Sequence, residues 1–196
     1  MMFQYKVYIL ILGNLANKTN FRSYVSFHSN CAILFSMKQK YFIDSHKALT
    51  GLVVLLMIAI YNQWTNTTAW LYLALHGTYG ILWVLKSNIF PDKSWEQEIS
   101  WGYGLVNLVA LSLYWISPWL IISQSVHVPA WYLGMCVSLY IFGIFFHFTT
   151  DMQKYIALKL QPAHLITTGM ATHCRNMNYF GELFLLHYAT QNSMLN

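Results

Sequence analysis

Four long apolar runs limit what this chain can fold into. They cover residues 48–64, 68–85, 99–122 and 130–150, and each is close to the ~20 residues that a helix needs to cross a bilayer. Of the 196 residues, 57% are hydrophobic and only 9% are charged. A soluble domain of this size could not cover so much apolar surface. The sequence therefore predicts an all-α, polytopic transmembrane bundle with about four full spans and a shorter C-terminal helix.

The positions of lysine and arginine predict how the bundle is oriented. The connections 62–66 and 123–129 contain neither residue type, whereas the other connections and the span ends carry Lys38, Lys40, Lys47, Lys86, Lys93, Lys154, Lys159 and Arg175. This alternation predicts a multi-pass integral membrane protein with all its basic segments on the cytoplasmic side. The net charge of +5 is scattered over span ends, as in proteins that meet anionic headgroups. We therefore expect the lipid bilayer as a partner, and no nucleic acid.

Local signals predict where the helices start, bend and stop. Pro118 should kink or end the third helix. Residues 90–92 read as a turn, and Ser94 with Gln97 fits a capping box that opens the third helix. Lys47 should extend its ammonium group out of the membrane from the first span. The three cysteines show no ligand spacing, so neither a disulfide framework nor a metal site is expected.

A polar segment precedes the last apolar stretch, which covers residues 183–189. Asn178 and Glu182 are four residues apart and so share one face of a helix that starts near Asn176 or Asn178. Arg175 lies just before that start, where free backbone N–H groups favour an anion. Ionisable side chains at the mouth of a membrane span are expensive and usually functional. The pattern therefore predicts a phosphate-binding site.

This segment resembles the C-terminal signature of the steroid 5-alpha-reductase superfamily. That signature is a Gly, a short spacer, Arg-Asn-Pro-Asn-Tyr, one variable residue, and Gly-Glu or Gly-Asp. Upstream, residues 150–154 resemble the Asp-x-Gln-Lys stretch of the family, and residues 75–80 and 90–96 resemble a poorly characterised branch of it. The signature matches at Gly169, Arg175, Asn176, Asn178, Tyr179, Gly181 and Glu182, with Met177 in place of the proline.

The resemblance implies an oxidoreductase of lipid metabolism. Its expected activity is NADPH-dependent reduction of a carbon–carbon double bond in a sterol-like or other membrane lipid substrate. The cofactor would bind on the cytoplasmic side. The residues that the resemblance assigns to the cofactor site are Asp151, Arg175, Asn178, Tyr179 and Glu182, with His147 one helical turn before Asp151 as a neighbour.

An aromatic stripe on the second span allows two interpretations. Tyr72, His76, Tyr79 and Trp83 recur at helical spacing, a pattern that more often reflects packing between helices. The functional alternative is an apolar substrate chamber. In it, His76 or Tyr79 would act as the catalytic proton donor to a carbonyl conjugated with the double bond.

Two other functions remain open. The isoprenylcysteine carboxyl methyltransferases share the architecture and an Arg-His-Pro-type signature but use S-adenosylmethionine. Asn176 and the ending through Glu182 favour the reductase. A non-catalytic relative is the second alternative, because the chain stops soon after Glu182 and Met177 lacks the fixed φ of proline. The last helix is thus expected to be truncated.

The domain boundaries expected from sequence separate two parts. Residues 41–196 form the steroid-5-alpha-reductase-like membrane domain. Residues 1–40 lack periodicity and are expected to be a poorly structured extension, with Met37 as a candidate for the true start.

Overall fold

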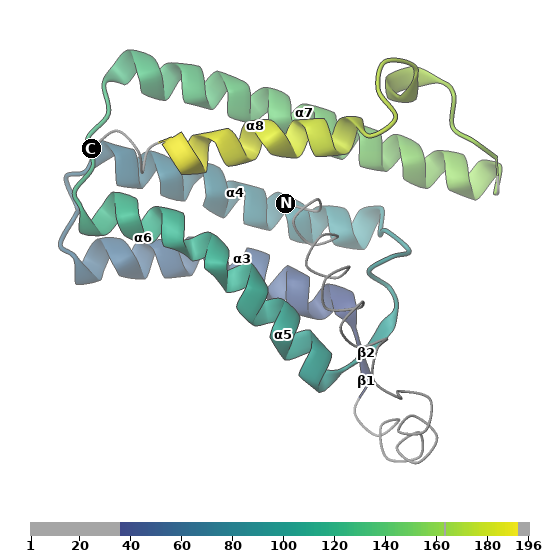
Figure 1. The fold of residues 1–196 in the computed structure, drawn as a ribbon, viewed down its shortest axis with the longest axis horizontal. Helices are drawn as coiled ribbons and strands as arrows, with labels where there is room; N and C mark the ends of the chain where they lie inside the picture. The colour runs from purple at the N-terminus through teal and green to yellow at the C-terminus, as the bar shows by residue number, and fades with distance from the viewer. Residues whose placement is uncertain (1–35, 163, 192–196) are drawn as a thin grey trace, which may run out of the picture.

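The computed structural model describes residues 36–162 and 164–191, and this part of the chain is mostly helical (Figure 1). The expectation for residues 1–35 falls outside these ranges. The long elements are α3 (Gln39–Ile60), α4 (Thr67–Ile89), α5 (Trp101–Ser112), α6 (Ile116–Ser123), α7 (Ala130–Leu160) and α8 (Met177–Gln191). Short 3₁₀ helices, η2 (Leu113–Trp115) and η3 (Gly169–Thr172), and two strands, β1 (Ser36–Lys38) and β2 (Glu98–Ser100), complete the described elements.

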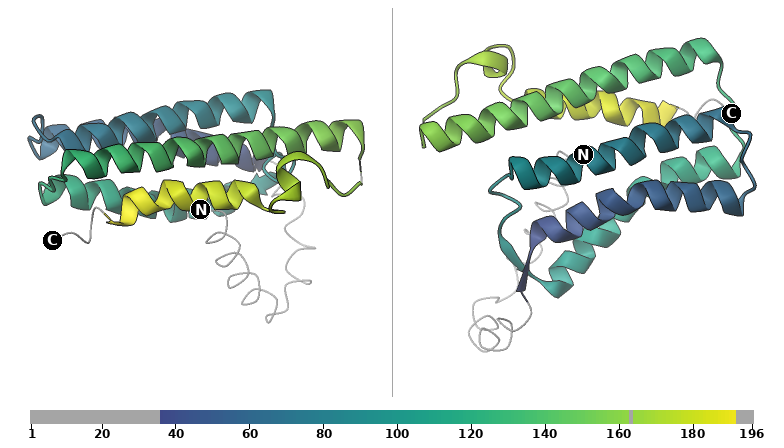
Figure 2. Two further views of the ribbon diagram at one scale, coloured as in Figure 1. Left: turned by 90° about the horizontal axis from the view of Figure 1, so that it is seen from above. Right: turned by 180° about the vertical axis from the view of Figure 1, so that it is seen from behind.

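The helices form a bundle with α4 in the middle (Figures 1 and 2). α3 and α4 form an antiparallel hairpin, and α5 and α6 pack along α3. On the other side, α4 contacts α7, and α8 packs along α7. The hairpin and the α7–α8 pair therefore meet along α4.

In the part of the chain that the structure describes, three helical segments are long and apolar enough to cross a membrane: Gln39–Ile60, Trp101–Ser123 and Ala130–Leu160. Large hydrophobic side chains such as Ile81, Val109 and Phe142 are exposed on the outside of the bundle, as expected where lipid replaces water. α4 has 23 residues but is less apolar than these three, because it also contains threonines, tyrosines and a histidine. The predicted membrane bundle is thus supported by three helices of spanning length.

Both loops at one end of the bundle close in the same way. After α3, Asn62 adopts a φ of 52°, and the N–H of Gln63 donates to the carbonyl of Ile58 at 2.8 Å. After α6, Ser125 has a φ of 53°, and the N–H of Val126 donates to Ile121 at 3.0 Å. These are Schellman caps, which satisfy the last carbonyls of a helix when the chain turns back.

The third apolar run is interrupted, as Pro118 predicted. α5 ends at Ser112, the 3₁₀ helix η2 follows, and α6 begins at Ile116. The proline ring lacks an N–H and clashes with the carbonyl four residues earlier, that of Tyr114. The break in α-helical geometry falls on that residue.

The capping box expected at Ser94 is wrong. The N–H and Oγ of Ser94 both donate to Asp92 Oδ1, at 2.9 and 2.6 Å, so Ser94 belongs to a turn with Asp92. Residues 98–100 then pair with residues 36–38 as a two-stranded antiparallel ribbon. Helix α5 begins only at Trp101, and its N-cap is Ser100, whose Oγ accepts from the N–H of Tyr103.

Helices α3 and α7 extend well beyond their apolar runs. α3 starts at Gln39, nine residues before the run, so Lys47 lies inside the helix with only 4% of its surface exposed. The expectation that Lys47 reaches out of the membrane is therefore wrong. α7 continues to Leu160, which places Asp151 inside a helix rather than at its end.

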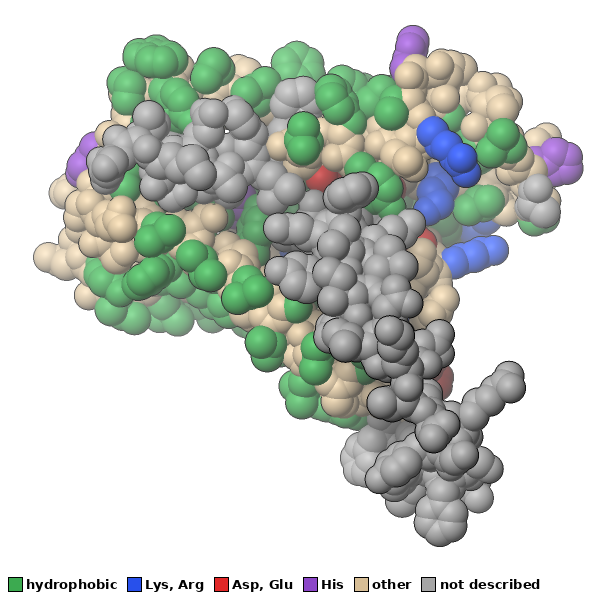
Figure 3. Space-filling model, in the orientation of Figure 1, with side chains coloured by type: hydrophobic (Ala, Val, Ile, Leu, Met, Phe, Trp, Pro, Cys, Tyr) green, Lys and Arg blue, Asp and Glu red, His purple; other side chains and the backbone are tan. Residues whose placement is uncertain are grey.

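Charge is segregated along the bundle. Within the described ranges, every Asp, Glu, Lys and Arg lies at the end where α3 and α8 begin and α4 and α7 stop. Figure 3 shows lysine and arginine side chains gathered at this end of one face. We refer to it as the charged end, and the candidate site lies there.

Candidate functional site: a buried ion network at the charged end

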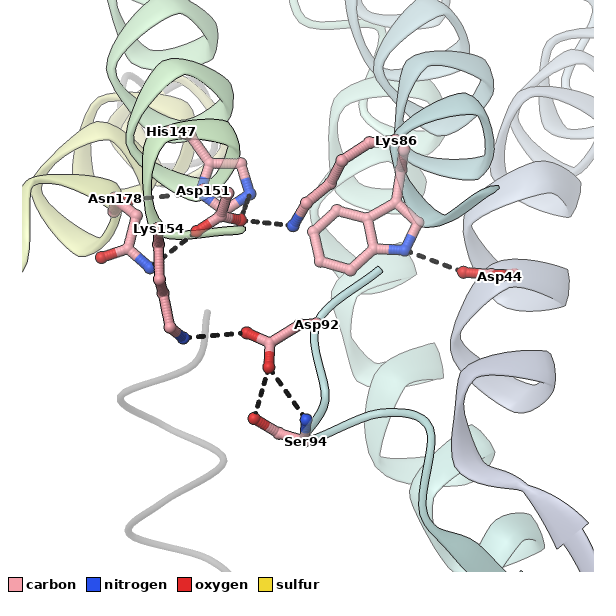
Figure 4. Close-up of polar contacts among 9 residues, drawn as sticks. Asp44, Lys86, Asp92, Ser94, His147, Asp151, Lys154 and Asn178 are labelled. Carbon is pink, nitrogen blue, oxygen red and sulfur yellow. Dashed lines mark hydrogen bonds and ion pairs between the residues drawn. The ribbon is translucent and has the colours of Figure 1, made fainter. Parts of the chain in front are cut away.

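A buried ion pair joins α4 to α7 at the charged end. The ammonium group of Lys86 donates a hydrogen bond to Asp151 Oδ2 (Figure 4). The two side chains are only 5% and 9% exposed. Because each ion has lost most of its water, removal of one partner would leave an uncompensated charge in the bundle.

The same carboxylate connects α7 to α8. Asn178 Nδ2 donates to Asp151 Oδ1 at 3.1 Å, and His147 Nδ1 lies 3.3 Å from the backbone carbonyl of Asn178 (Figure 4). A carbonyl oxygen only accepts, so the proton of a neutral His147 is on Nδ1. His147 Nε2 lies 3.6 Å from Asp151 Oδ2, which is too long for a hydrogen bond.

A second cation and a second carboxylate lie next to this pair. Lys47 of α3 and Glu182 of α8 are both 4% exposed, and the two charges interact electrostatically. The network thus holds two ammonium groups and two carboxylates on four helices. Opposite charges in equal number make their joint burial tolerable.

The indole of Trp83 occupies the space between the two lysines. Its ring centre is 5.2 Å from Lys47 Nζ and 4.5 Å from Lys86 Nζ, within the range of cation–π attraction. The ring is stacked on His147 with 5.8 Å between centres. Its Nε1 donates to Asp44 Oδ1 at 3.0 Å. Trp83 therefore fixes both cations and the imidazole.

A cavity of about 260 Å³ opens beside the Lys86–Asp151 pair. The loop after α4 and the last turns of α7 form its walls. Its lining combines four lysines, three carboxylates and an apolar wall: Lys86, Phe90, Pro91, Asp92, Lys93, Glu96, Asp151, Lys154, Tyr155, Leu158 and Lys159. The inner ion pair thus has direct access to a basic cavity.

The loop that forms one wall of the cavity is held in place by Asp92. Besides its two bonds from Ser94, this carboxylate accepts a bond from Lys154 Nζ at 3.1 Å (Figure 4). Burial raises the pKa of Asp92, but the Ser94 hydrogen bonds and the Lys154 ammonium outweigh burial and bring it below its ordinary value. Asp92 therefore stays ionised and holds the loop against α7 through Lys154.

The third carboxylate of the cavity is paired as well. Glu96 lies 2.7 Å from Lys38 Nζ and 2.5 Å from Lys40 Nζ. Hydrogen bonds from these two lysines lower its pKa. All three carboxylates that line the cavity thus have cationic partners.

The structure brings together part of the predicted cofactor site. Asp151, Asn178 and Glu182 lie in the ion network, and half-buried Tyr179 lies near Lys154, Asp92 and Asp151. Arg175 is exposed and does not line the cavity.

The loop between α7 and α8 that carries Arg175 is tied to α7 by Gln153. The side chain of Gln153 donates to the carbonyl of Thr168 at 2.5 Å and accepts from the N–H of Met170 at 3.0 Å. Gly169 between them has a φ of +62°, which a residue with a side chain adopts less readily. The signature glycine thus opens η3 in a left-handed backbone conformation.

The two predicted proton donors have different surroundings. His76 is 2% exposed. It donates from Nδ1 to the carbonyl of Tyr72 at 3.3 Å and accepts at Nε2 from the hydroxyl of Tyr114 at 3.0 Å. Both of its nitrogens are therefore engaged with neighbours. Tyr79 borders the ion network, with Lys47 Nζ at 4.9 Å from its ring centre.

Sequence reasoning missed two members of the network, Lys47 and Lys86. Both were interpreted as cations that set topology. The positions of Asp151 and Glu182 could have indicated these lysines, because two carboxylates at span ends need nearby cations once the helices pack. Among the described residues, no group of His, Cys, Asp and Glu is arranged to hold a metal ion.

Comparisons of this chain with protein-family models, with curated proteins and with solved structures find no match.

Proposed function

We propose that this protein is a membrane-embedded, NADPH-dependent reductase of a carbon–carbon double bond in a sterol-like or other lipid substrate. One observation carries the proposal. Asp151 and Asn178 are 27 positions apart in the sequence, yet their side chains are joined by a hydrogen bond beside a basic cavity. These are residues that the resemblance to the steroid 5-alpha-reductase superfamily assigns to the cofactor site.

The residues present suit a nicotinamide dinucleotide. Lysines line the cavity for phosphate groups, and the Asp151 carboxylate and Asn178 amide can hydrogen-bond to ribose hydroxyls or a carboxamide. The volume of about 260 Å³ is below the roughly 300–1,000 Å³ of pockets that enclose a whole drug-sized ligand. The cavity would therefore enclose part of the dinucleotide.

In the proposed reduction, residues of this chain would donate the proton and exclude water from the reacting groups. When bound, NADPH would supply a hydride to one carbon of the double bond. The neighbouring carbon, or the oxygen of a conjugated carbonyl, would take a proton from the hydroxyl of Tyr79. Tyr79 would regain that proton from solvent after the product has left. The Lys47 ammonium beside the Tyr79 ring would stabilise the transient phenolate. His76 would be structural, since both of its nitrogens have partners.

In this proposal α4 is a fourth membrane span. Its 23 residues reach roughly 34 Å at about 1.5 Å per residue, enough for a hydrocarbon core of ~30 Å. Its less apolar residues, including Tyr72, His76, Tyr79 and Trp83, are buried in the bundle, so they would not meet lipid. The lack of Lys and Arg in the loops at the opposite end would place the charged end in the cytoplasm.

The cavity also bears on the methyltransferase alternative. S-adenosylmethionine carries a sulfonium cation near its reacting carbon, and four lysines line the cavity against three carboxylates that are already paired. This charge balance favours an anionic ligand such as a dinucleotide.

Thermal unfolding of the detergent-purified chain tests the proposal. A ligand that binds only the folded state raises its melting temperature. NADPH and NADP⁺ should do so and S-adenosylmethionine should not. The Glu182→Gln variant should weaken the NADP⁺ effect, whereas Glu98→Gln, at an exposed carboxylate of the ribbon, should keep it. Stabilisation by S-adenosylmethionine alone would favour the methyltransferase, and none by either would favour a non-catalytic relative.

A further inference from the structure

Two lysines at the cavity differ from the other two in their partners. Lys86 is paired with Asp151, and Lys154 is paired with Asp92. Lys93 and Lys159 are exposed, and no described carboxylate lies within salt-bridge distance of either. The cavity therefore presents two positive charges that its own acidic residues do not neutralise.

Both lysines belong to segments with fixed positions. Lys93 follows Asp92 directly, and Asp92 is held by Ser94 and Lys154. Lys159 is in the last turn of α7, and its ammonium lies 4.5 Å from the ring centre of Tyr155. A charge that is positioned before binding loses less entropy when a ligand arrives.

An aromatic pair lies beside the two charges. The rings of Phe90 and Tyr155 are 6.5 Å apart at an angle of 53°, and both residues line the cavity. Aromatic faces bind flat heterocycles by stacking. Two cations next to such a wall match a ligand with a ring system and a doubly charged anionic group. A phosphate monoester has close to that charge at neutral pH.

The depth of the cavity separates two sources of such a phosphate. Lys159 is nine residues beyond Thr150, where the apolar run ends, which is about 13 Å along a helix. The headgroup layer adds only some 5–8 Å to each side of the hydrocarbon core. Lys159 would thus lie in water, within reach of a soluble nucleotide and beyond most lipid headgroups.

We infer that Lys93 and Lys159 bind the phosphate monoester of a nucleotide, with its base against Phe90 and Tyr155. This inference rests on the proposed function, where that monoester is the 2′-phosphate that distinguishes NADPH from NADH. It also reassigns the phosphate contact that the resemblance gave to Arg175, because Arg175 does not line the cavity. The chain should therefore prefer NADPH to NADH through these two lysines.

Calorimetric titration of the full chain in detergent tests the inference with four probes: NADP⁺, NAD⁺, adenosine 2′,5′-bisphosphate and dispersed phosphatidic acid. Lys93→Gln and Lys159→Gln should each lower the affinity for NADP⁺ and for the bisphosphate about tenfold, as expected for the loss of one charge-assisted contact. NAD⁺ affinity should be unchanged. Arg175→Gln tests the phosphate contact that the resemblance gave to Arg175, and it should lower NADP⁺ affinity less than either lysine variant because Arg175 lies outside the cavity. Unliganded melting temperatures check that each variant is folded.

The outcomes separate this inference from the proposed function. Unchanged NADP⁺ affinity in both lysine variants, an equal loss for NAD⁺, or a loss confined to Arg175→Gln would overturn the inference while the reductase proposal stands. Binding of the bisphosphate without NADP⁺ would keep the phosphate site and reject the dinucleotide function. Lysine-dependent binding of phosphatidic acid alone would assign the site to a lipid headgroup, and binding of no probe would reject both.

Discussion

Gly143 of α7 and Gly181 of α8 lie back to back, with no room for a methyl group on either. A Cβ atom on Gly143 would come within 2.7 Å of the carbonyl oxygen of Gly181, and one on Gly181 within 2.6 Å of the carbonyl oxygen of Gly143. Small residues at such crossings let membrane helices approach closely. The contact places Glu182 and Asn178 against α7, where the ion network forms.

Gly181→Ala should therefore destabilise the protein by about 1–3 kcal/mol through overpacking. A fall in melting temperature in detergent measures the effect. Gly134→Ala is the matched control in α7, because a Cβ there meets nothing within 4 Å and alanine favours the helix. Equal melting temperatures for the two variants would show that α7 and α8 do not meet at these glycines.

Asp151→Asn should cost more, about 3–5 kcal/mol, because it leaves the Lys86 ammonium buried without a counter-charge. The double variant Lys86→Met with Asp151→Asn removes both charges and should recover most of that stability. Thermal unfolding compares the two. If the double variant is as unstable as the single one, the ion pair is not what holds α4 to α7.

The position of the two loops without Lys or Arg can be tested by cysteine labelling in sealed vesicles. We expect native Cys174, exposed in the α7–α8 connection, to react with an impermeant maleimide on one side of the membrane. A cysteine introduced by Thr65→Cys or Gln124→Cys, in a chain without the native cysteines, should react only from the other side. Labelling of all three from one side would contradict the bundle orientation.

Stability should depend on pH through Asp92. Its pKa is lower in the folded protein than its ordinary value of 3.8, so the ionised form is favoured by folding. The resulting stabilisation is present above that ordinary value and is lost as the pH falls through the lowered one. The difference in melting temperature between the wild type and Asp92→Asn should therefore shrink from pH 7 to pH 3. A melting-temperature difference that stays constant with pH would show that ionisation of Asp92 does not stabilise the loop.

Tyr79→Phe should lower the rate of NADPH oxidation with a 4-en-3-one sterol by about 10²–10⁴-fold, the usual contribution of a positioned proton donor. NADP⁺ affinity should stay the same, since the variant changes only the hydroxyl. Tyr114→Phe is the comparison, because that hydroxyl donates to His76, and it should affect stability more than rate. Equal rate losses in both variants would remove Tyr79 from the proposed chemistry.

The helices could be predicted because apolar runs of spanning length leave few alternatives. The break before Pro118 also followed from local chemistry. The β1–β2 ribbon could not be predicted, since three residues per strand show no alternation and their pairing depends on where α3 and α5 meet. The capping box was wrongly predicted at Ser94 because the Ser94 hydroxyl instead donates its hydrogen bond to Asp92.

The candidate site was predictable only in part. Asn178 and Glu182 share a helix face, and this follows from their spacing alone. The burial of Lys47 and Lys86 follows instead from the packing of α3, α4, α7 and α8, a tertiary property without a local pattern. The sequence could not predict that Lys93 and Lys159 line one cavity, because they are 66 positions apart.

The end of the bundle opposite the ion network has a bearing on how the protein enters its membrane. Its two loops close on Schellman caps and touch through a hydrogen bond from Gln63 Nε2 to Ser125 Oγ at 2.6 Å. Neither loop carries an Asp, Glu, Lys or Arg. A transmembrane voltage does work only on charge, about 2.3 kcal/mol per elementary charge per 100 mV. In the proposed orientation, the helix pairs that these loops connect would therefore cross the membrane with no work done against the membrane potential at their tips.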